Sequence, residues 1–204
     1  FIDAAKNEAR SPSDSTAAAE SSAEVDAATL YGAYQQRLAN MGAVDFGDLI
    51  VGVLRLFRSQ PQLLERYQRQ IRFLHVDEYQ DTNHAQYRLL QLLTGEQRNL
   101  AVVGDDDQSI YSWRGADIRN ILDFQEDFPD ATVVKLEQNY RSTVRILKAA
   151  NSLISNNPKL FEKRLWSDLG HGDAIQIMPT KDDEHEAEAQ AAFELGLLTN
   201  FESD

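Results

Sequence analysis

The segment that most constrains the fold runs from Ile71 to Gly115, because it holds two short apolar runs that each end in acids. The runs are Phe73–Val76 and Leu100–Val103, and they are followed by Asp77-Glu78 and by Asp105-Asp106-Asp107. Short apolar runs bounded by polar turns predict buried strands of a parallel sheet. The apolar residues between the runs have helical spacing, so the segment predicts a strand–helix–strand unit.

The two acidic clusters should lie at one edge of that sheet, where open α/β sheets bind their ligands. An Asp-Glu pair at a strand end suits nucleotide hydrolysis, since one carboxylate can hold Mg²⁺ while its neighbour orients or deprotonates the attacking water. An isolated pair such as Asp77-Glu78 is more often a helix cap or a solvated surface feature. The assignment therefore depends on the surrounding sequence.

Three longer motifs supply that context. DEYQDTN (Asp77–Asn83) resembles the Walker B motif of the UvrD/Rep/PcrA family of superfamily 1 DNA helicases. VVGDDDQSIYSWRGA (Val102–Ala116) resembles motif III of that family, and LEQNYRS (Leu136–Ser142) resembles its motif IV. The motifs occur in the family's order and near its spacing, and the resemblance extends from about Ala5 to about Leu198.

The resemblance implies an α/β fold: a RecA-like parallel sheet of the P-loop NTPase type, a helical insertion and a partial second RecA-like domain. Residues 1–70 would be the helical insertion (1B), with a Ser/Ala-rich loop. Residues 71–136 would be the second half of the first motor domain, and residues 137–204 the beginning of the second.

The resemblance also implies roles in ATP hydrolysis. Asp77 would bind Mg²⁺, and Glu78 would activate the hydrolytic water. Gln108 would contact the γ-phosphate of ATP and couple it to motif III. Tyr140 would stack on adenine, and Arg141 would reach the γ-phosphate as an arginine finger, a role that suits a permanently charged, bidentate guanidinium.

A second set of residues would bind DNA. By resemblance, Tyr111 and Trp113 stack on the bases of a single strand, and Arg114 ties the DNA site to the ATP site. Stacking on aromatic rings tolerates any base sequence and is worth about 1–3 kcal/mol per base. Two aromatic residues near a strand end could equally be core, but the string QSIYSWRG favours the DNA role.

The sequence contains no G-x-x-x-x-G-K-[ST] phosphate loop. In the family this loop lies upstream and motifs V and VI lie downstream, so we expect a piece of a helicase or a degenerate relative that is inactive alone. The parent function implied is ATP-driven 3′→5′ translocation on single-stranded DNA with unwinding of duplex DNA, in repair or replication. The alternatives are a non-enzymatic DNA-binding or interaction module, and the motor portion of a RecB- or AddA-like helicase–nuclease.

The composition limits the kinds of site, compartment and partner that this chain can have. Among 204 residues there is no cysteine, which excludes a disulfide framework and a cysteine metal site. No run approaches a membrane span or a signal peptide, so we expect a cytoplasmic protein without a membrane partner. The net charge of −13 argues against nucleic-acid binding, but Lys135–Arg164 holds seven bases against two acids while Lys181–Asp204 holds one base against eight acids.

The remaining segments predict further elements. Helices are expected at Phe1–Arg10, Val25–Asn40, Phe46–Phe57, Pro61–Gln70, Gly115–Asp127 and Asp182–Leu198, and in the segment that Ser142 caps.

Two further strands are expected, at Ala131–Leu136 and Ala174–Met178, while Ser11–Glu24 predicts a flexible loop. His75 is expected to be a packed core histidine. Because truncated parallel sheets leave apolar faces uncovered, we also expect self-association or binding of a partner such as a repair protein.

Overall fold

The computed structural model describes residues 1–158 and 161–194. The chain divides into two units, with the boundary between Val133 and Val134, and each unit is described by itself.

The first unit begins with five helices whose starts are fixed by local sequence. They are α1 (Ile2–Asn7), α2 (Pro12–Ala17), α3 (Ser22–Asn40), α4 (Phe46–Ser59) and α5 (Pro61–Gln70). In α2, α3 and α4 the cap side chain accepts the backbone N–H of the third helical residue, which returns the bond, so each helix starts with a capping box. A proline opens α2 and α5, where its fixed φ is already helical.

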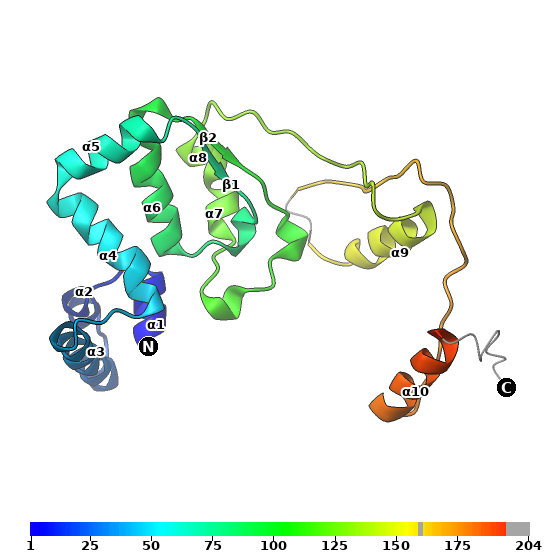
Figure 1. Ribbon diagram of the computed structural model, residues 1–204, viewed down its shortest axis with the longest axis horizontal. Helices are drawn as coiled ribbons and strands as arrows, with labels where there is room; N and C mark the ends of the chain where they lie inside the picture. Colours follow the sequence, from blue (N-terminus) through cyan, green and yellow to red (C-terminus); the bar gives the residue numbers. More distant parts are fainter. Residues whose placement is uncertain (159–160, 195–204) are drawn as a thin grey trace. The chain divides into compact units, whose positions relative to one another are not determined.

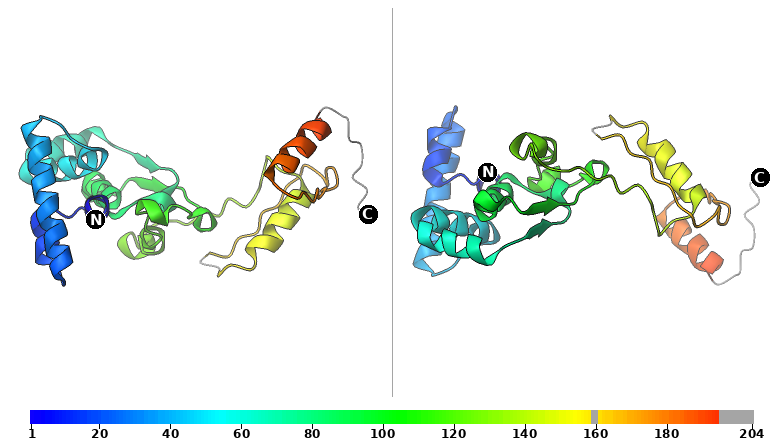
Figure 2. Two further views of the ribbon diagram at one scale, coloured as in Figure 1. Left: turned by 90° about the horizontal axis from the view of Figure 1, so that it is seen from below. Right: turned by 90° about the horizontal axis from the view of Figure 1, so that it is seen from above.

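The prediction of a flexible loop at Ser11–Glu24 is therefore wrong. Ser11 and Ser21 cap α2 and α3, and Ser15 of α2 is buried. Serine lowers the stability of a helix interior but stabilises its start, and counting serines as spacer missed this difference. The pair α2–α3 packs together at one end of the unit, away from the strands (Figure 2).

Helical spacing in the sequence predicts buried faces at Leu30, Tyr31, Tyr34 and Leu38 on α3 and at Phe46, Leu49, Ile50, Val53, Leu54 and Phe57 on α4. These predicted faces hold only in part. Tyr31 on α3 and Leu54 and Phe57 on α4 are buried, as expected, but Leu30 and Phe46 are exposed.

The strand–helix–strand prediction is confirmed. Strand β1 (Leu74–Val76) pairs in parallel with β2 (Leu100–Val102), with His75 opposite Ala101. Between them runs α6 (His84–Thr94), which packs against α1, α4 and α5 (Figure 1). The part of the chain that the structure describes contains only these two strands, so it shows a small parallel sheet rather than a full RecA-like one.

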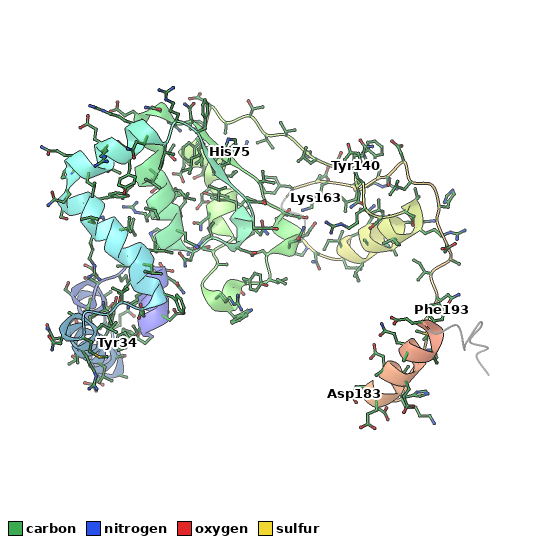
Figure 3. The ribbon with its side chains drawn as sticks, viewed as in Figure 1. Tyr34, His75, Tyr140, Lys163, Asp183 and Phe193 are labelled. Carbon is green, nitrogen blue, oxygen red and sulfur yellow. The ribbon has the colours of Figure 1, made fainter. Side chains whose placement is uncertain are left out.

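His75 is exposed, so its assignment as a packed core histidine is wrong. It points away from the face that carries the strand residues on either side of it, both half-buried (Figure 3). A parallel sheet buries both faces only when helices cover both, and in the part of the chain that the structure describes, His75 and its partner Ala101 on this face are exposed.

The two further strands that the sequence predicted are not formed. Ala131–Leu136 and Ala174–Met178 have no ladder partner among the described residues, and Leu136 is 77% exposed. A strand exists only through hydrogen bonds to a neighbour, so an apolar run without a neighbour stays extended. The predicted helix at Gly115–Asp127 is instead two short helices, α7 (Arg119–Leu122) and α8 (Phe124–Asp127).

Short 3₁₀ turns complete the first unit: η1 (Tyr79–Asp81), η2 (Gly95–Gln97), η3 (Asp106–Gln108) and η4 (Ser112–Arg114). Two of them, η3 and η4, follow β2 and lie within motif III.

The second unit contains α9 (Val144–Ile154) and α10 (Asp183–Glu194). Ser142 does not cap α9. The N-cap position belongs to Thr143, which makes no side-chain cap bond, and Asn139 Oδ1 accepts the backbone N–H of Ser142 instead. The acidic helix is confirmed over its described part.

Helical spacing in the sequence predicts that Ala187, Ala191, Leu195 and Leu198 form the buried side of α10. This prediction is wrong in the described part of the helix. Ala187 and Ala191 are exposed, whereas Ala189 is buried. Leu195 and Leu198, assigned to the same side, lie outside the described residues.

A buried lysine ties α1 to the start of α4. Lys6 is 2% exposed, and its Nζ lies 2.6 Å from Asp45 Oδ2 and 2.9 Å from Asp48 Oδ1. The hydroxyl of Tyr34 donates to the same oxygen of Asp45 at 3.0 Å (Figure 3). The two acids thus cap α4 and neutralise Lys6.

No helix in the described ranges is long and apolar enough to cross a membrane.

Candidate functional site

The predicted hydrolytic acids lie directly after β1. Asp77 and Glu78 are both exposed, and Asp77 Oδ1 accepts the backbone N–H of Glu78 at 2.9 Å. Glu78 has φ 49° and ψ 44°, in the left-handed region that non-glycine residues seldom occupy. Such strained positions are concentrated at functional sites. The backbone turn sends the chain into η1 and leaves both carboxylates at the carboxyl end of the strand.

Gln80 is a site residue that sequence reasoning missed. Its side chain is 1% exposed, its Nε2 donates to Glu78 Oε2 at 2.8 Å, and its Oε1 accepts the backbone N–H of Asp105 at 3.0 Å. An amide can donate and accept at the same time, which a carboxylate cannot. A glutamine inside the string DEYQD, next to a candidate base, was the available signal.

The bond from the Asp105 N–H to Gln80 connects the acids after β1 to the loop after β2. Asp105 Oδ2 accepts from Gln108 Nε2 at 2.9 Å, so a continuous path runs from Glu78 through Gln80 and Asp105 to Gln108. Gly104 makes the approach feasible, because a Cβ there would lie 2.9 Å from Gln80 Oε1. The structure therefore brings Glu78 and Gln108 into one hydrogen-bonded network.

The core beneath this network consists of buried side chains that carry no charge. Tyr79 is buried, and its ring meets that of Phe124 edge-on at a centroid distance of 5.6 Å. Burial raises the pKa of Tyr79 to about 12, so its hydroxyl stays protonated at ordinary pH. Asn120 is also buried, and its Nδ2 donates to the carbonyl of Thr82 at 2.9 Å. These contacts hold η1 against α7.

The predicted DNA-binding residues form one cluster on η4 and the residue before it. The ring centroids of Tyr111 and Trp113 lie 6.2 Å apart, and the Arg114 guanidinium sits 4.9 Å from the first ring and 4.5 Å from the second. Trp113 is 72% exposed, which argues against a core role. A cation against an exposed ring and a half-buried one provides stacking surface and positive charge together.

The predicted adenine and γ-phosphate residues lie in the second unit. Tyr140 is 78% exposed, and its hydroxyl donates to Gln138 Oε1 at 2.9 Å (Figure 3). Arg141 is exposed, and Asn139 Oδ1 accepts its backbone N–H at 3.0 Å. Since the units are described separately, these two residues are placed only within their own unit.

Comparison with known families decides what kind of chain this is. The model of the UvrD/REP helicase N-terminal domain matches residues 1–129, and that of the UvrD-like helicase C-terminal domain matches residues 134–194. The chain belongs to the UvrD/REP helicase family. The family predicted from the three motifs is thereby confirmed.

Individual relatives agree with this assignment. The chain is 50% identical over 187 residues to the ATP-dependent DNA helicase PcrA of Leuconostoc citreum, which covers 92% of this chain and 25% of that protein. It is 49% identical over 183 residues to the ATP-dependent DNA helicase Rep of Salmonella typhimurium and to that of Escherichia coli strain K12, which covers 90% of this chain and 27% of each relative. The chain thus spans about a quarter of the length of these relatives.

The family domains also fit the structure of this UvrD/REP chain. The N-terminal model ends at residue 129 and the C-terminal model begins at residue 134. The boundary between the two units, at Val133 and Val134, falls at that junction.

Proposed function

We propose that this chain is part of an ATP-dependent DNA helicase that translocates 3′→5′ on single-stranded DNA and unwinds duplex DNA in repair or replication. The observation that carries the proposal is the hydrogen-bonded path from Glu78 through Gln80 and Asp105 to Gln108. Such a path joins a candidate hydrolytic base to the loop that presents the aromatic pair. Relatives that are named ATP-dependent DNA helicases support it.

In this proposal β1 and β2 belong to the first RecA-like motor domain, at residues 71–136. Residues 1–70 form the helical insertion, and residues 137–204 begin the second motor domain. The parallel pairing of β1 and β2 around α6 supports the assignment, because it is the repeating unit of such sheets.

The residues present suit part of a site for ATP and Mg²⁺. Asp77 offers an exposed carboxylate at the carboxyl end of β1, a hard oxygen ligand of the kind Mg²⁺ prefers. When bound, the ion neutralises charge on the phosphates. Tyr140 would provide a stacking surface for adenine, and Gln108 and Arg141 would contact the γ-phosphate. A phosphate loop would come from outside these 204 residues.

Glu78 would orient the attacking water and accept its proton. Gln80 donates to Oε2 of that carboxylate, which fixes its plane and leaves Oε1 to accept from water. A positioned general base contributes about 10²–10⁴-fold to the rate.

Tyr111 and Trp113 would stack on successive bases of the strand, with Arg114 adding positive charge next to the phosphates. A second function fits the same cluster. Because the sequence lacks a phosphate loop, the chain could serve as a DNA-binding module that does not hydrolyse ATP.

One pair of substitutions tests the proposal in a protein that joins these residues to a phosphate loop, from flanking sequence or as a chimera with the Rep helicase of Escherichia coli. Glu78→Gln should cut ATP hydrolysis by about 10²–10⁴-fold and leave single-strand affinity intact. Trp113→Ala should weaken single-strand affinity by about 1–3 kcal/mol and leave DNA-independent hydrolysis intact.

The outcomes separate the two candidates. Hydrolysis that survives Glu78→Gln would remove Glu78 from the reaction. Strand binding that depends on Trp113 in a protein without any ATP turnover would favour the non-enzymatic module.

A further inference from the structure

Asn7, at the last position of α1, makes three contacts through its side-chain amide. Its Nδ2 donates to the backbone carbonyl of Arg114 at 3.1 Å and to Asp3 Oδ2 at 3.3 Å. Its Oδ1 accepts from Asn83 Nδ2 at 2.9 Å. Both donors and the acceptor are therefore used. The reversed amide would set its oxygen against two other oxygens, so the orientation is determined by the partners.

The first of these bonds reaches the aromatic cluster from 107 positions earlier in the sequence. Arg114 is the residue whose side chain lies over both Tyr111 and Trp113. Gly115 follows with φ +85°, and a Cβ there would lie 2.5 Å from Asn7 Nδ2. The loop is thus shaped to receive the amide, since a side chain at residue 115 would displace it.

The remaining bonds of the loop are mostly local. The backbone N–H of Arg114 and that of Ala116 both donate to the carbonyl of Tyr111, which sets the turn but not its place on the unit. Placement comes from the Asn83–Ala116 bridge and from the bond of the Asp117 N–H to the carbonyl of Thr82. Asn7 adds a tie at Arg114 itself, the residue nearest the rings.

The second bond of Asn7 leads back towards the hydrolytic acids. Asn83 ends the motif that begins at Asp77, and it caps α6 by accepting the N–H of Gln86 at 2.9 Å. Asn7 therefore joins α1, the start of α6 and the aromatic loop at a single amide. A residue with both donor and acceptor groups is needed, which asparagine provides and aspartate does not.

We propose that Asn7 is a positioning residue for single-stranded DNA binding: it holds the Arg114 backbone so that Tyr111 and Trp113 present a fixed stacking surface. The inference rests on the proposed stacking function of those rings. A fixed surface binds more tightly because less side-chain and loop freedom is lost when the strand arrives.

The test uses the 204-residue chain with Trp166→Phe, so that Trp113 is the single tryptophan. Fluorescence titration with an oligothymidylate measures strand affinity, and the fluorescence anisotropy of Trp113 without DNA measures how firmly the loop is held. Asn7→Ala should weaken binding about three- to tenfold, the equivalent of one lost hydrogen bond, and should lower the anisotropy.

Two further variants sharpen the result. Asn7→Asp keeps the acceptor for Asn83 and loses the donor to Arg114, so it should lower the anisotropy as Asn7→Ala does while α6 keeps its cap. Asn40→Ala is the matched control, because Asn40 is exposed at the end of α3 and accepts from Gln36 on the same helix. It should change neither readout.

The outcomes distinguish the inference from the function on which it rests. If Trp113→Ala weakens binding while Asn7→Ala and Asn7→Asp leave affinity and anisotropy unchanged, Asn7 does not position the loop. If Trp113→Ala itself binds with unchanged affinity, the stacking function is wrong and the inference is overturned with it. Lower anisotropy together with weaker binding in both Asn7 variants supports the inference.

Discussion

The two units of this chain are stabilised in different ways. In the first unit, the polar side chains that join segments far apart in sequence are themselves buried: Lys6, which pairs with Asp45, is 2% exposed, and Gln80, which accepts from the backbone of Asp105, is 1% exposed. In the second unit the corresponding ties are half-buried or exposed, as where Asn151 bonds the backbone of Leu165.

The difference shows how the predicted site residues are held in each unit. In the first unit, Asp77, Glu78 and Trp113 are exposed and Tyr111 is half-buried, yet the buried Gln80 and the half-buried Asn7 bond to the segments that carry them. Tyr140 and Arg141 of the second unit are held through Asn139 and Gln138, which are themselves only half-buried. Substitutions should therefore cost most in the first unit, and the following predictions test this from the largest expected effect to the smallest.

The largest effect is expected at Lys6. Lys6→Ala should lower the free energy of unfolding of the first unit by about 3–5 kcal/mol, because removing one partner leaves buried carboxylates uncompensated. Urea unfolding, monitored by the hydrogen exchange of peptides from each unit, measures the free energies of unfolding of the two units separately. Lys148→Ala, at an exposed position on α9, is the matched control and should change stability by less than about 0.5 kcal/mol. Equal costs at the two positions would contradict the comparison.

Gln80 should give the next largest effect. Gln80→Ala removes the acceptor of the Asp105 N–H and the donor to Glu78 at a buried position, and should cost about 1–3 kcal/mol of unfolding free energy in the first unit. Gln80→Glu is nearly isosteric, but it places a second carboxyl 2.8 Å from Glu78.

The pH dependence of Gln80→Glu distinguishes hydrogen bonding from simple packing. Burial and the like charge should raise the pKa of the new carboxyl above its unfolded value. A raised folded pKa means stability that is present at low pH and lost as the pH rises, so the penalty should grow between about pH 4 and pH 7. A penalty that does not vary with pH would show that only the shape of Gln80 matters.

The same contrast explains what the sequence could predict. The two apolar runs after Ile71 and the helical spacing between them led to correct elements, because strand, helix and strand follow one another directly along the chain and pair with each other. The runs at Ala131–Leu136 and Ala174–Met178 did not form strands, because a strand depends on a neighbour that no local pattern specifies.

The site shows the same division. Asp77, Glu78, Tyr111 and Trp113 could be picked out from their motifs. Gln80 and Asn7 could not be found in this way, since their role depends on contacts across 25 and 107 positions of the sequence.

In the second unit, Asn151→Ala tests the weaker side of the comparison. Asn151 Nδ2 donates to the carbonyl of Leu165 at 2.8 Å, and its Oδ1 accepts the N–H of Leu165 at 3.2 Å. Because the site is only half-buried, water can replace part of these bonds, and the expected cost is about 1 kcal/mol. The measurement is urea unfolding monitored by the fluorescence of Trp166, in a chain that also carries Trp113→Phe so that Trp166 is the single tryptophan. A cost above that of Gln80→Ala would reverse the ranking of the two units.

The smallest effect is expected at Asp45, in how the free energy of unfolding of the first unit falls at low pH. Burial acts to raise the pKa of Asp45, but hydrogen bonds from Lys6, the Asp48 backbone and Tyr34 outweigh it and hold that pKa below its ordinary value of 3.8. A depressed folded pKa contributes stability that is fully present above the unfolded value and is lost as the pH falls through the folded one. Unfolding of the first unit in urea should thus become easier below about pH 3.8. In Asp45→Asn, which can still cap α4, this part of the acid dependence should disappear while the Trp166 signal of the second unit keeps its own profile. If the free energy of unfolding of Asp45→Asn falls at low pH as it does in the unchanged chain, the carboxylate contributes to the start of α4 only as a cap and not as the partner of Lys6.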